Sequence, residues 1–238
     1  MVIPAYNEAH RLPEALEKIS SWARKTNRKI QLIVVDDGST DRTRQIAADF
    51  EAPDIAVRLL ENKQNRGKGY SVRRGMLSAE TDAPILMTDA DLSSPIEEVE
   101  KLLLKLAEGF EVVIGSRMMP ESIIEPPRRP MRRLTGWGFR MLRRLFLLPE
   151  IRDTQCGFKL FTAAAAQDAF TDMKSEGWAF ETEALALDKK RGRRHCEVGL
   201  RWTEDDRTPL HAGRDAPRML MSLLKIRWRL WRHRAAAG

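Results

Sequence analysis

Short apolar runs alternate with longer amphipathic segments through the first half of the chain. This alternation is typical of an α/β fold, in which helices cover both faces of a mostly parallel sheet. The apolar runs predict strands at Met1–Pro4, Lys29–Val35, Ile55–Leu60, Pro84–Thr88 and Glu111–Ser116. The amphipathic segments predict helices at Pro13–Lys25, Asp41–Phe50, Lys68–Ser78 and Pro95–Glu108. The sequence therefore indicates a Rossmann-like, doubly wound sheet.

Two later segments predict helices that are basic on one side and apolar on the other. In Arg132–Leu148, and again from Pro217 onward, apolar residues share one side of the helix and arginines gather opposite them. Such a helix either lies in a membrane interface or packs its apolar side on the sheet, and the pattern leaves both open. We expect a catalytic domain over residues 1–212, with an interface helix at about 130–148, and a basic amphipathic helix over residues 213–238.

The formal net charge of +7 is concentrated in these two segments. Seven arginines and no acids lie between Pro126 and Pro149, and the stretch from Arg214 to Arg234 carries a further net +6. The remainder of the chain is therefore net acidic. Basic residues near anionic lipid contribute about 1 kcal/mol each, so these segments suit an anionic membrane surface, and the acidic remainder argues against nucleic acid as a partner.

The length of the chain and its cysteine content bear on the number of domains and on the cellular compartment. A chain of 238 residues suffices for one large domain. Its two cysteines, Cys156 and Cys196, lack the spacing of metal ligands. No signal peptide is recognisable, and no apolar run approaches the roughly 20 residues that a spanning helix needs. We therefore expect a cytoplasmic protein that attaches to the membrane peripherally.

Two carboxylates follow the fourth predicted strand. Asp89 and Asp91 are spaced i, i+2, which in extended backbone sends both side chains to the same side. A divalent cation such as Mg²⁺ or Mn²⁺ can bridge such a pair to a substrate phosphate. The second predicted strand likewise ends in Asp36 and Asp37. Because ligands of open α/β sheets bind beyond the carboxyl ends of the strands, the sequence predicts an acidic, metal-binding edge.

A glycine-flanked lysine, Lys68, begins the third predicted helix. It either reaches a diphosphate or is an ordinary helix start. The chain lacks both the Gly-x-Gly-x-x-Gly turn after its first strand and the Gly-Lys-Ser/Thr phosphate loop. These absences favour a nucleotide diphosphate held through a metal over a nicotinamide cofactor.

Seven motifs follow one another along nearly the whole chain. They are Val2–Glu8, Asp36–Asp41, Asp89–Ser93, Gly115–Arg117, Asp153–Phe161, Trp178–Glu183 and Arg201–Glu204. The first four resemble family 2 glycosyltransferases of the GT-A fold, and the last three resemble the polyprenyl-phosphate branch, above all the dolichyl-phosphate glucosyltransferases. The resemblance implies transfer of a hexose, most simply from UDP-glucose, to a polyprenyl phosphate at the cytoplasmic membrane face.

The resemblance also implies roles for individual residues. Asp89, Asp91 and Arg117 would be catalytic, with the two aspartates holding the metal. The donor side would comprise Pro4, Ala5, Tyr6, Glu8, Val35, Asp37, Lys68, Asp89 and Ala90. The sugar and acceptor side would comprise Arg117, Asp153, Gln155 and Lys159. Arg133 and Arg201 are further candidates for the acceptor phosphate, because arginine presents a planar fork to phosphate; each is otherwise a surface or packing arginine.

The expected reaction is a single displacement with inversion at the anomeric carbon. A cation neutralises the charge that grows on the leaving diphosphate. The acceptor phosphate has a second pKa of about 6 and is largely dianionic near neutrality, so no protein base is required. This fits the absence of histidine from the seven motifs.

Two alternatives remain open. The donor is GDP-mannose or a UDP-N-acetyl sugar if base and sugar are read by other contacts, which residue spacing does not reveal. The chain is otherwise a non-enzymatic basic protein that binds a membrane or nucleic acid, although the acidic remainder and the intact pair of Asp89 and Asp91 argue against it. A membrane-protein partner and a homo-oligomer are also left open.

Overall fold

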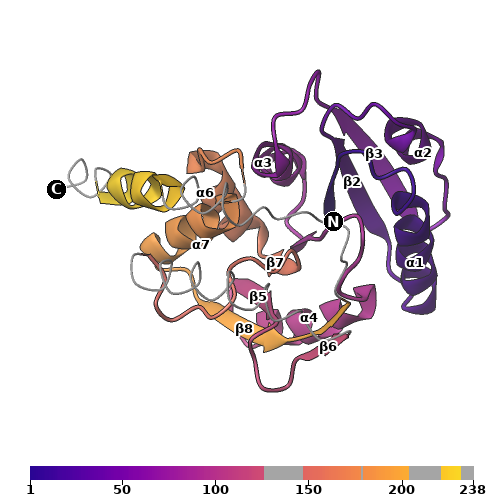
Figure 1. Ribbon diagram of the computed structural model, residues 1–238. Helices are drawn as coiled ribbons and strands as arrows, with labels where there is room; N and C mark the ends of the chain where they lie inside the picture. Colours follow the sequence, from indigo (N-terminus) through magenta and orange to yellow (C-terminus); the bar gives the residue numbers. More distant parts are fainter. Residues whose placement is uncertain (126–146, 178, 204–220, 232–238) are drawn as a thin grey trace.

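The computed structural model describes residues 1–125, 147–177, 179–203 and 221–231. Its middle layer is a 7-stranded sheet in the order β3-β2-β1-β4-β7-β5-β8 (Figure 1). The strands are β1 (Val2–Ala5), β2 (Ile30–Asp36), β3 (Ile55–Glu61), β4 (Ile85–Met87), β5 (Val112–Ser116), β7 (Lys159–Phe161) and β8 (His195–Gly199). All neighbours in this sheet run parallel except β7, which lies antiparallel between β4 and β5.

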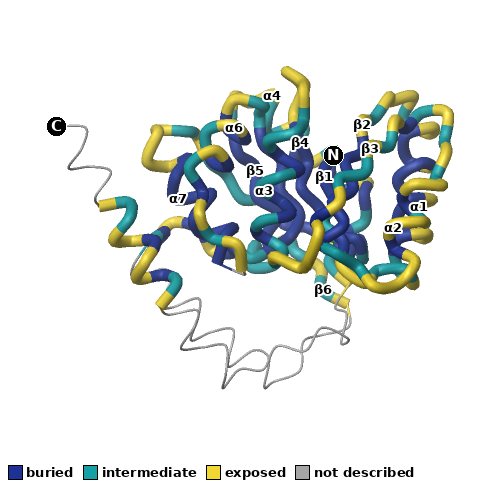
Figure 2. The backbone as a smooth tube through the Cα atoms, turned by 90° about the horizontal axis from the view of Figure 1, so that it is seen from above, coloured by how far each residue is buried: buried dark blue, intermediate teal, exposed yellow. Residues whose placement is uncertain are grey.

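Helices cover both faces of the sheet (Figure 1). One face carries α1 (Leu12–Lys25), α2 (Thr43–Asp49), the short 3-10 helix η1 (Ile96–Glu98) and α4 (Val99–Ala107). The other carries α3 (Lys68–Ser78), α6 (Ala163–Asp172) and α7 (Phe180–Lys190). The buried strands lie enclosed between these two layers, as Figure 2 shows.

The strand sequences suit a sheet that is covered on both sides. In β2 the run Leu32–Val35 is fully buried, and its side chains alternate between the cores on the two faces. β5 does the same, with Val113 in one core and Val112 and Ile114 in the other. Continuous apolar runs are therefore the expected signature of these strands.

A second, 2-stranded sheet pairs β6 (Ile123–Glu125) with β9 (Arg201–Thr203). It is tied to the loop that follows β4. The Thr203 backbone N–H donates to the Ser93 carbonyl at 2.7 Å, and the Ser94 hydroxyl donates to the Arg201 carbonyl at 3.1 Å. These bonds hold Arg201 and Thr203 of β9 beside the loop that contains Asp91.

A helix at residues 221–231, here called the amphipathic helix, lies against α7 (Figure 1). Leu223 and Ile226 are buried, and Arg229 forms an ion pair with Glu183 of α7 at 3.0 Å. The sequence pattern places Arg229 opposite the apolar side of the helix, and in the structure its guanidinium contacts Glu183, a buried carboxylate that needs a cationic partner. Within the described part of the chain, every helix is too short or too polar to span a bilayer.

The predicted α/β fold with a mostly parallel sheet is confirmed. α3 has the predicted bounds, and the predicted strands match β1 to β5 to within two residues at either end. Six elements were not predicted: α6, α7, β6, β7, β8 and β9. The predicted helix at Arg132–Leu148 falls almost wholly outside the described residues, as does the proposed boundary between residues 212 and 213.

Candidate active site

The candidate site lies at the edge of the sheet where the parallel strands end. β4 leads into Asp89, and β5 leads into Arg117. Lys159, the first residue of the antiparallel β7, pairs with Met87 on one side and Ile114 on the other. The segment that precedes β7 therefore arrives at the same edge as the segments that follow β4 and β5.

The Lys68 ammonium contacts the Asp89 carboxylate, with Nζ and Oδ1 2.6 Å apart. Lys68 is the first residue of α3 and follows Gly67, whose φ of +100° strongly favours glycine. Burial opposes the charge of Lys68, but Asp89 and Glu181 raise its pKa above the ordinary value. Lys68 is therefore a protonated cation inside the site, as its predicted contact with a diphosphate requires.

Asp91 is the second carboxylate of the pair. Burial and then the neighbouring charge of Asp89 raise the pKa of Asp91, whereas a hydrogen bond from the Ser93 backbone N–H at 3.0 Å opposes this rise. The intervening Leu92 is buried and has a φ of +44°, a strained conformation for a branched side chain. Strain of this kind persists where the surrounding structure holds a loop in a functional geometry.

The donor set at Asp89 and Asp91 fits a hard divalent cation. Burial and the charge of Asp89 raise the pKa of Asp91, and a positive ion held between the two carboxylates would relieve this repulsion. In the described part of the chain, no three His, Cys, Asp or Glu side chains come close enough to form a metal site by themselves. Mg²⁺ commonly binds through one or two carboxylates plus substrate phosphates. Two aspartates together with a diphosphate would therefore suit its coordination preference.

Gly157 brings the loop before β7 against Asp89. A Cβ atom at Gly157 would stand only 2.1 Å from Asp89 Oδ2, so no other residue fits without displacing this carboxylate. The loop between Asp153 and Lys159 is thereby in direct contact with the predicted metal ligand.

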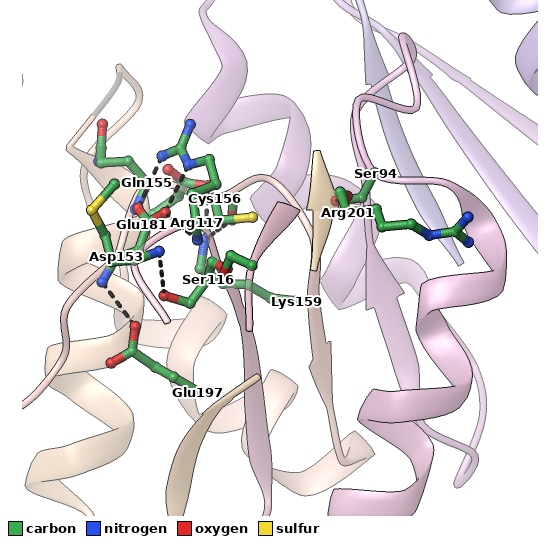
Figure 3. A network of polar contacts seen from close by, with 12 residues as sticks. Ser94, Ser116, Arg117, Asp153, Gln155, Cys156, Lys159, Glu181, Glu197 and Arg201 are labelled. Carbon is green, nitrogen blue, oxygen red and sulfur yellow. Dashed lines mark hydrogen bonds and ion pairs between the residues drawn. The ribbon is translucent and has the colours of Figure 1, made fainter. Parts of the chain in front are cut away.

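Arg117 and Asp153 form a bidentate ion pair (Figure 3), with Nε–Oδ2 at 2.7 Å and Nη2–Oδ1 at 2.9 Å. The guanidinium also stacks on Trp202, 4.8 Å from its ring centroid. Although burial opposes ionisation, Arg117 holds the pKa of Asp153 well below its usual range, and Asp153 raises that of Arg117. Both groups are therefore charged, and the Nε–Nη2 edge of the guanidinium is taken by Asp153.

Lys159 and Glu181 form a second ion pair, which is almost completely buried, with Nζ and Oε1 2.9 Å apart. Lys159 also donates to the Cys156 carbonyl. Its predicted place was on the ligand side of the site, but it points into the protein because Glu181 and the carbonyl hold it there. Glu181 raises the pKa of both Lys68 and Arg117, so its charge acts on both halves of the site.

Backbone hydrogen bonds fix the rest of the predicted acceptor loop. Glu197 of β8 accepts from the N–H groups of Arg152 and Asp153 at 2.7 and 2.9 Å. The Gln155 N–H donates to Asp153 Oδ1 at 3.2 Å. Asp153 and Gln155 thus lie beside Arg117, as predicted.

The structure does not bring Arg201 to this group. Its Nε donates to Glu98 Oε1 at 2.7 Å, and Figure 3 shows it near Ser94, apart from Arg117. Successive strand residues point to opposite faces, so Trp202 reaches Arg117 and Arg201 necessarily points away. The predicted role of Arg201 at the acceptor phosphate is therefore not one that this geometry allows, and Arg133 lies outside the described residues.

The end of β1 supplies predicted donor-side residues. Tyr6 is 44% exposed, and Glu8 is bound to Arg11 through two contacts of 2.5 and 2.6 Å. Burial raises the pKa of Glu8 against the influence of Arg11, and Asp91 and Asp89 add to this rise. Glu8 therefore lies within electrostatic reach of both aspartates.

The remaining residues of the predicted donor side have side chains that are turned into the protein or that hold neighbouring backbone. The side chains of Ala5, Val35 and Ala90 are buried in the two cores, and Pro4 of β1 pairs with Val35 of β2. Asp37 is also buried, and its carboxylate accepts from Asn62 and from the N–H groups of Arg66 and Gly67. Asp37 thus anchors the turn that leads into Lys68.

Sequence reasoning missed several contributors. Gly157, Glu181 and Trp202 occur in the quoted motifs but were given no role, and Glu98 lay outside them. Their functions depend on contacts between distant segments, such as Arg117 with Trp202, that no local pattern reveals.

A mostly parallel sheet with paired carboxylates, a lysine and an oriented arginine at one edge is the arrangement of a GT-A glycosyltransferase. The family model described as Glycosyl transferase family 2 matches residues 1–170. The chain belongs to this family and is a glycosyltransferase, which settles the choice between an enzyme and a non-enzymatic protein.

Similar proteins agree with this assignment. The chain is 38% identical over 250 residues to a dolichyl-phosphate beta-glucosyltransferase of Drosophila melanogaster, covering 97% of this chain and 76% of the relative. It is 34% identical over 241 residues to the protein of that name from Dictyostelium discoideum, covering 96% and 73%. The same fold occurs in glucosyl-3-phosphoglycerate synthase from Mycobacterium tuberculosis in complex with Mn²⁺, UDP and phosphoglyceric acid, with a TM-score of 0.68, 21% identity and coverage of 95% and 76%.

Proposed function

We propose that this glycosyltransferase moves glucose from UDP-glucose to a polyprenyl phosphate of the dolichyl phosphate class, with Mg²⁺ or Mn²⁺ as cofactor. The names of the similar glucosyltransferases support the sugar and the acceptor. The observation that carries the proposal is the meeting of Lys68, Asp89 and Gly157, which joins the donor side to the loop that orients Arg117.

On the donor side, Asp89 and Asp91 would hold the metal ion. When bound, the ion would act as a Lewis acid toward the leaving diphosphate. Lys68 is a second cation at the same place and would contact the diphosphate if Asp89 held the metal ion. Glu8 and Tyr6, at the end of β1, would face the nucleoside. The synthase that shares this fold binds Mn²⁺ together with UDP, in line with this arrangement.

On the acceptor side, Arg117 would bind the phosphate of the lipid. Asp153 and Trp202 fix the plane of its guanidinium, so the Nη1 edge is presented in one direction. A phosphate with a second pKa of about 6 is mostly dianionic at pH 7 and attacks without a protein base. The oxygen–carbon bond forms as the carbon–oxygen bond to UDP breaks, with inversion of configuration.

The lipid acceptor calls for a membrane surface, and the amphipathic helix is the part of the described chain best suited to one. Four apolar side chains lie on its solvent side within one narrow arc, about 46–65% exposed: Met221, Leu224, Trp228 and Trp231. Lys225 and Arg227 flank this arc. Tryptophan and basic residues in this order favour the interface of an anionic bilayer, so we infer a peripheral protein of the cytoplasmic face.

A donor screen tests the proposed function. The chain is incubated with a short polyprenyl phosphate and, in turn, UDP-glucose, GDP-mannose and a UDP-N-acetyl sugar, with and without Mn²⁺, and the glycolipid is detected by mass. The expected product is a hexosyl lipid from UDP-glucose, formed only with the metal. Product from GDP-mannose alone would replace the donor assignment, and product in the presence of a chelator would contradict the role of Asp89 and Asp91.

A further inference from the structure

Glu183 of α7 is almost fully buried and has no role in the reaction described so far. Its two carboxylate oxygens contact different parts of the protein. Oε1 accepts from Arg229 of the amphipathic helix at 3.0 Å. Oε2 accepts from the backbone N–H groups of Lys174 and Ser175 at 3.2 and 2.7 Å. Charge-assisted bonds of this kind hold a buried carboxylate in one orientation, so Glu183 ties the amphipathic helix to the segment Lys174–Glu176.

The segment Lys174–Glu176 in turn holds the start of α3. The Glu176 carbonyl accepts from the Gly69 backbone N–H at 2.8 Å. A Cβ atom at either Gly67 or Gly69 would come within 2.8 Å of the same carbonyl oxygen, so both glycines that flank Lys68 lie directly against it. The position of Lys68 therefore depends on where this carbonyl is.

We propose that Glu183 is a positioning residue for Lys68. Through Lys174–Glu176 it fixes the turn at Gly67–Gly69, so that the Lys68 ammonium meets Asp89 at 2.6 Å. Through Arg229 it connects the same turn to the amphipathic helix. This inference rests on the proposed function, because that function places Lys68 at the donor diphosphate.

The chemistry of Glu183 explains why a neutral side chain would not replace it. Loss of the negative charge leaves Arg229 without its counter-charge in a half-buried position and weakens two hydrogen bonds inside the protein. The weaker bonds hold the segment Lys174–Glu176 less firmly. Because Gly69 and Gly67 lie against that segment, the turn that carries Lys68 loses its fixed partner.

The test compares Glu183→Gln with a matched control, Lys190→Gln. Lys190, the last residue of α7, also binds the amphipathic helix, through the Leu230 carbonyl at 3.3 Å, at the end of α7 remote from Glu183. Two quantities are measured on the full chain: hydrogen exchange of the peptide over residues 66–70, and the affinity for UDP with Mn²⁺ by calorimetry. In Glu183→Gln we expect exchange at Gly69 and Tyr70 to be about tenfold faster and UDP to bind about tenfold more weakly, with Lys190→Gln unchanged in both.

Each outcome decides one proposal. Wild-type exchange and UDP affinity in a folded Glu183→Gln variant would overturn the positioning role, as would equal effects from Lys190→Gln. If Glu183→Gln does not fold, Arg229→Gln takes its place, and faster exchange over residues 66–70 supports the inference while unchanged exchange overturns it. Failure of the proposed function is seen separately, as a wild-type chain that binds no UDP.

Discussion

The guanidinium of Arg117 and the carboxylate of Asp153 bind each other edge to edge, through two contacts of 2.7 and 2.9 Å. Both side chains are largely buried, at 17% and 4% exposure. A bidentate pair fixes the plane of the guanidinium, whereas a single contact leaves it free to rotate. Asp153 therefore determines the plane of the Arg117 guanidinium and the direction of its Nη1 edge.

Replacing Asp153 by asparagine should lower the free energy of unfolding at pH 7 by about 3–5 kcal/mol, because it leaves a buried arginine without its counter-charge. The pKa of Asp153 is held below its usual range, so its contribution is complete above the unfolded-state pKa of about 3.9 and is lost as the pH falls below that value. Denaturant unfolding at a series of pH values should show that the free energy of unfolding falls more steeply with decreasing pH in the wild type than in Asp153→Asn. Parallel profiles would contradict the assigned ion pair.

Asp91→Asn should reduce sugar transfer by at least about 10²-fold, because one of two proposed metal ligands is lost. Without metal the variant should be at least as stable as the wild type, since the like charge beside Asp89 is removed. Steady-state kinetics and thermal unfolding, with and without Mn²⁺ and UDP, measure both effects. Asp82→Asn, an exposed carboxylate before β4, is the control and should behave as wild type. Normal turnover by Asp91→Asn would refute the metal assignment.

Gly157→Ala should weaken Mn²⁺-dependent UDP binding by about tenfold or more, because the added methyl group would displace the Asp89 carboxylate. The matched control is Gly177→Ala, where an added Cβ meets nothing within 4 Å. Calorimetric titration of both variants with UDP in the presence of Mn²⁺ gives the comparison. Equal affinities in the two variants would show that Asp89 has room to shift.

Asp188→Asn should stabilise the protein at alkaline pH. Neither carboxylate oxygen of Asp188 has a hydrogen-bond partner among the described residues, and burial, followed by the charge of Asp168, raises its pKa to about 8. A carboxyl group with a raised folded pKa makes its contribution below the unfolded value of about 3.9 and loses it as the pH rises toward 8. The variant should therefore come close to the wild type near pH 4 and exceed it by about 5 kcal/mol at pH 8, as measured by denaturant unfolding. A difference that does not change with pH would rule out this titration.

Changing Trp228 and Trp231 together to serine should lower binding to anionic vesicles by about tenfold or more, because both rings lie on the exposed apolar side of the amphipathic helix. Leu104→Ser is the control, since Leu104 is 67% exposed but belongs to α4. Vesicle flotation measures the bound fraction. Unchanged binding of the double variant would show that this helix has only a structural role.

The first half of the fold was predictable because its central strands are buried on both faces. β2 and β5 carry continuous buried runs next to polar residues, and α3 follows a glycine, Gly67, whose backbone conformation marks the start of the helix. The acidic edge followed from the same reasoning, since Asp89 and Asp91 come directly after a strand.

The second half of the fold was harder to predict from the sequence because contacts between distant segments determine its elements. β7 has three residues, one of them a lysine, and no local pattern separates it from a loop. Lys159 is buried only because Glu181, 22 positions away in the sequence, provides a counter-charge. The direction of Arg201 depends likewise on the register of β9 against β6.

β7 has a geometric consequence for the transferred sugar. It is inserted between β4 and β5, so the ends of these strands, and with them Asp89 and Arg117, are offset by two ladder spacings, about 10 Å. If Asp89 and Arg117 hold the donor and the acceptor as proposed, main-chain pairing sets the room for a pyranose ring between them. Changes to side chains around the sugar would then leave the separation of the two substrates unaltered.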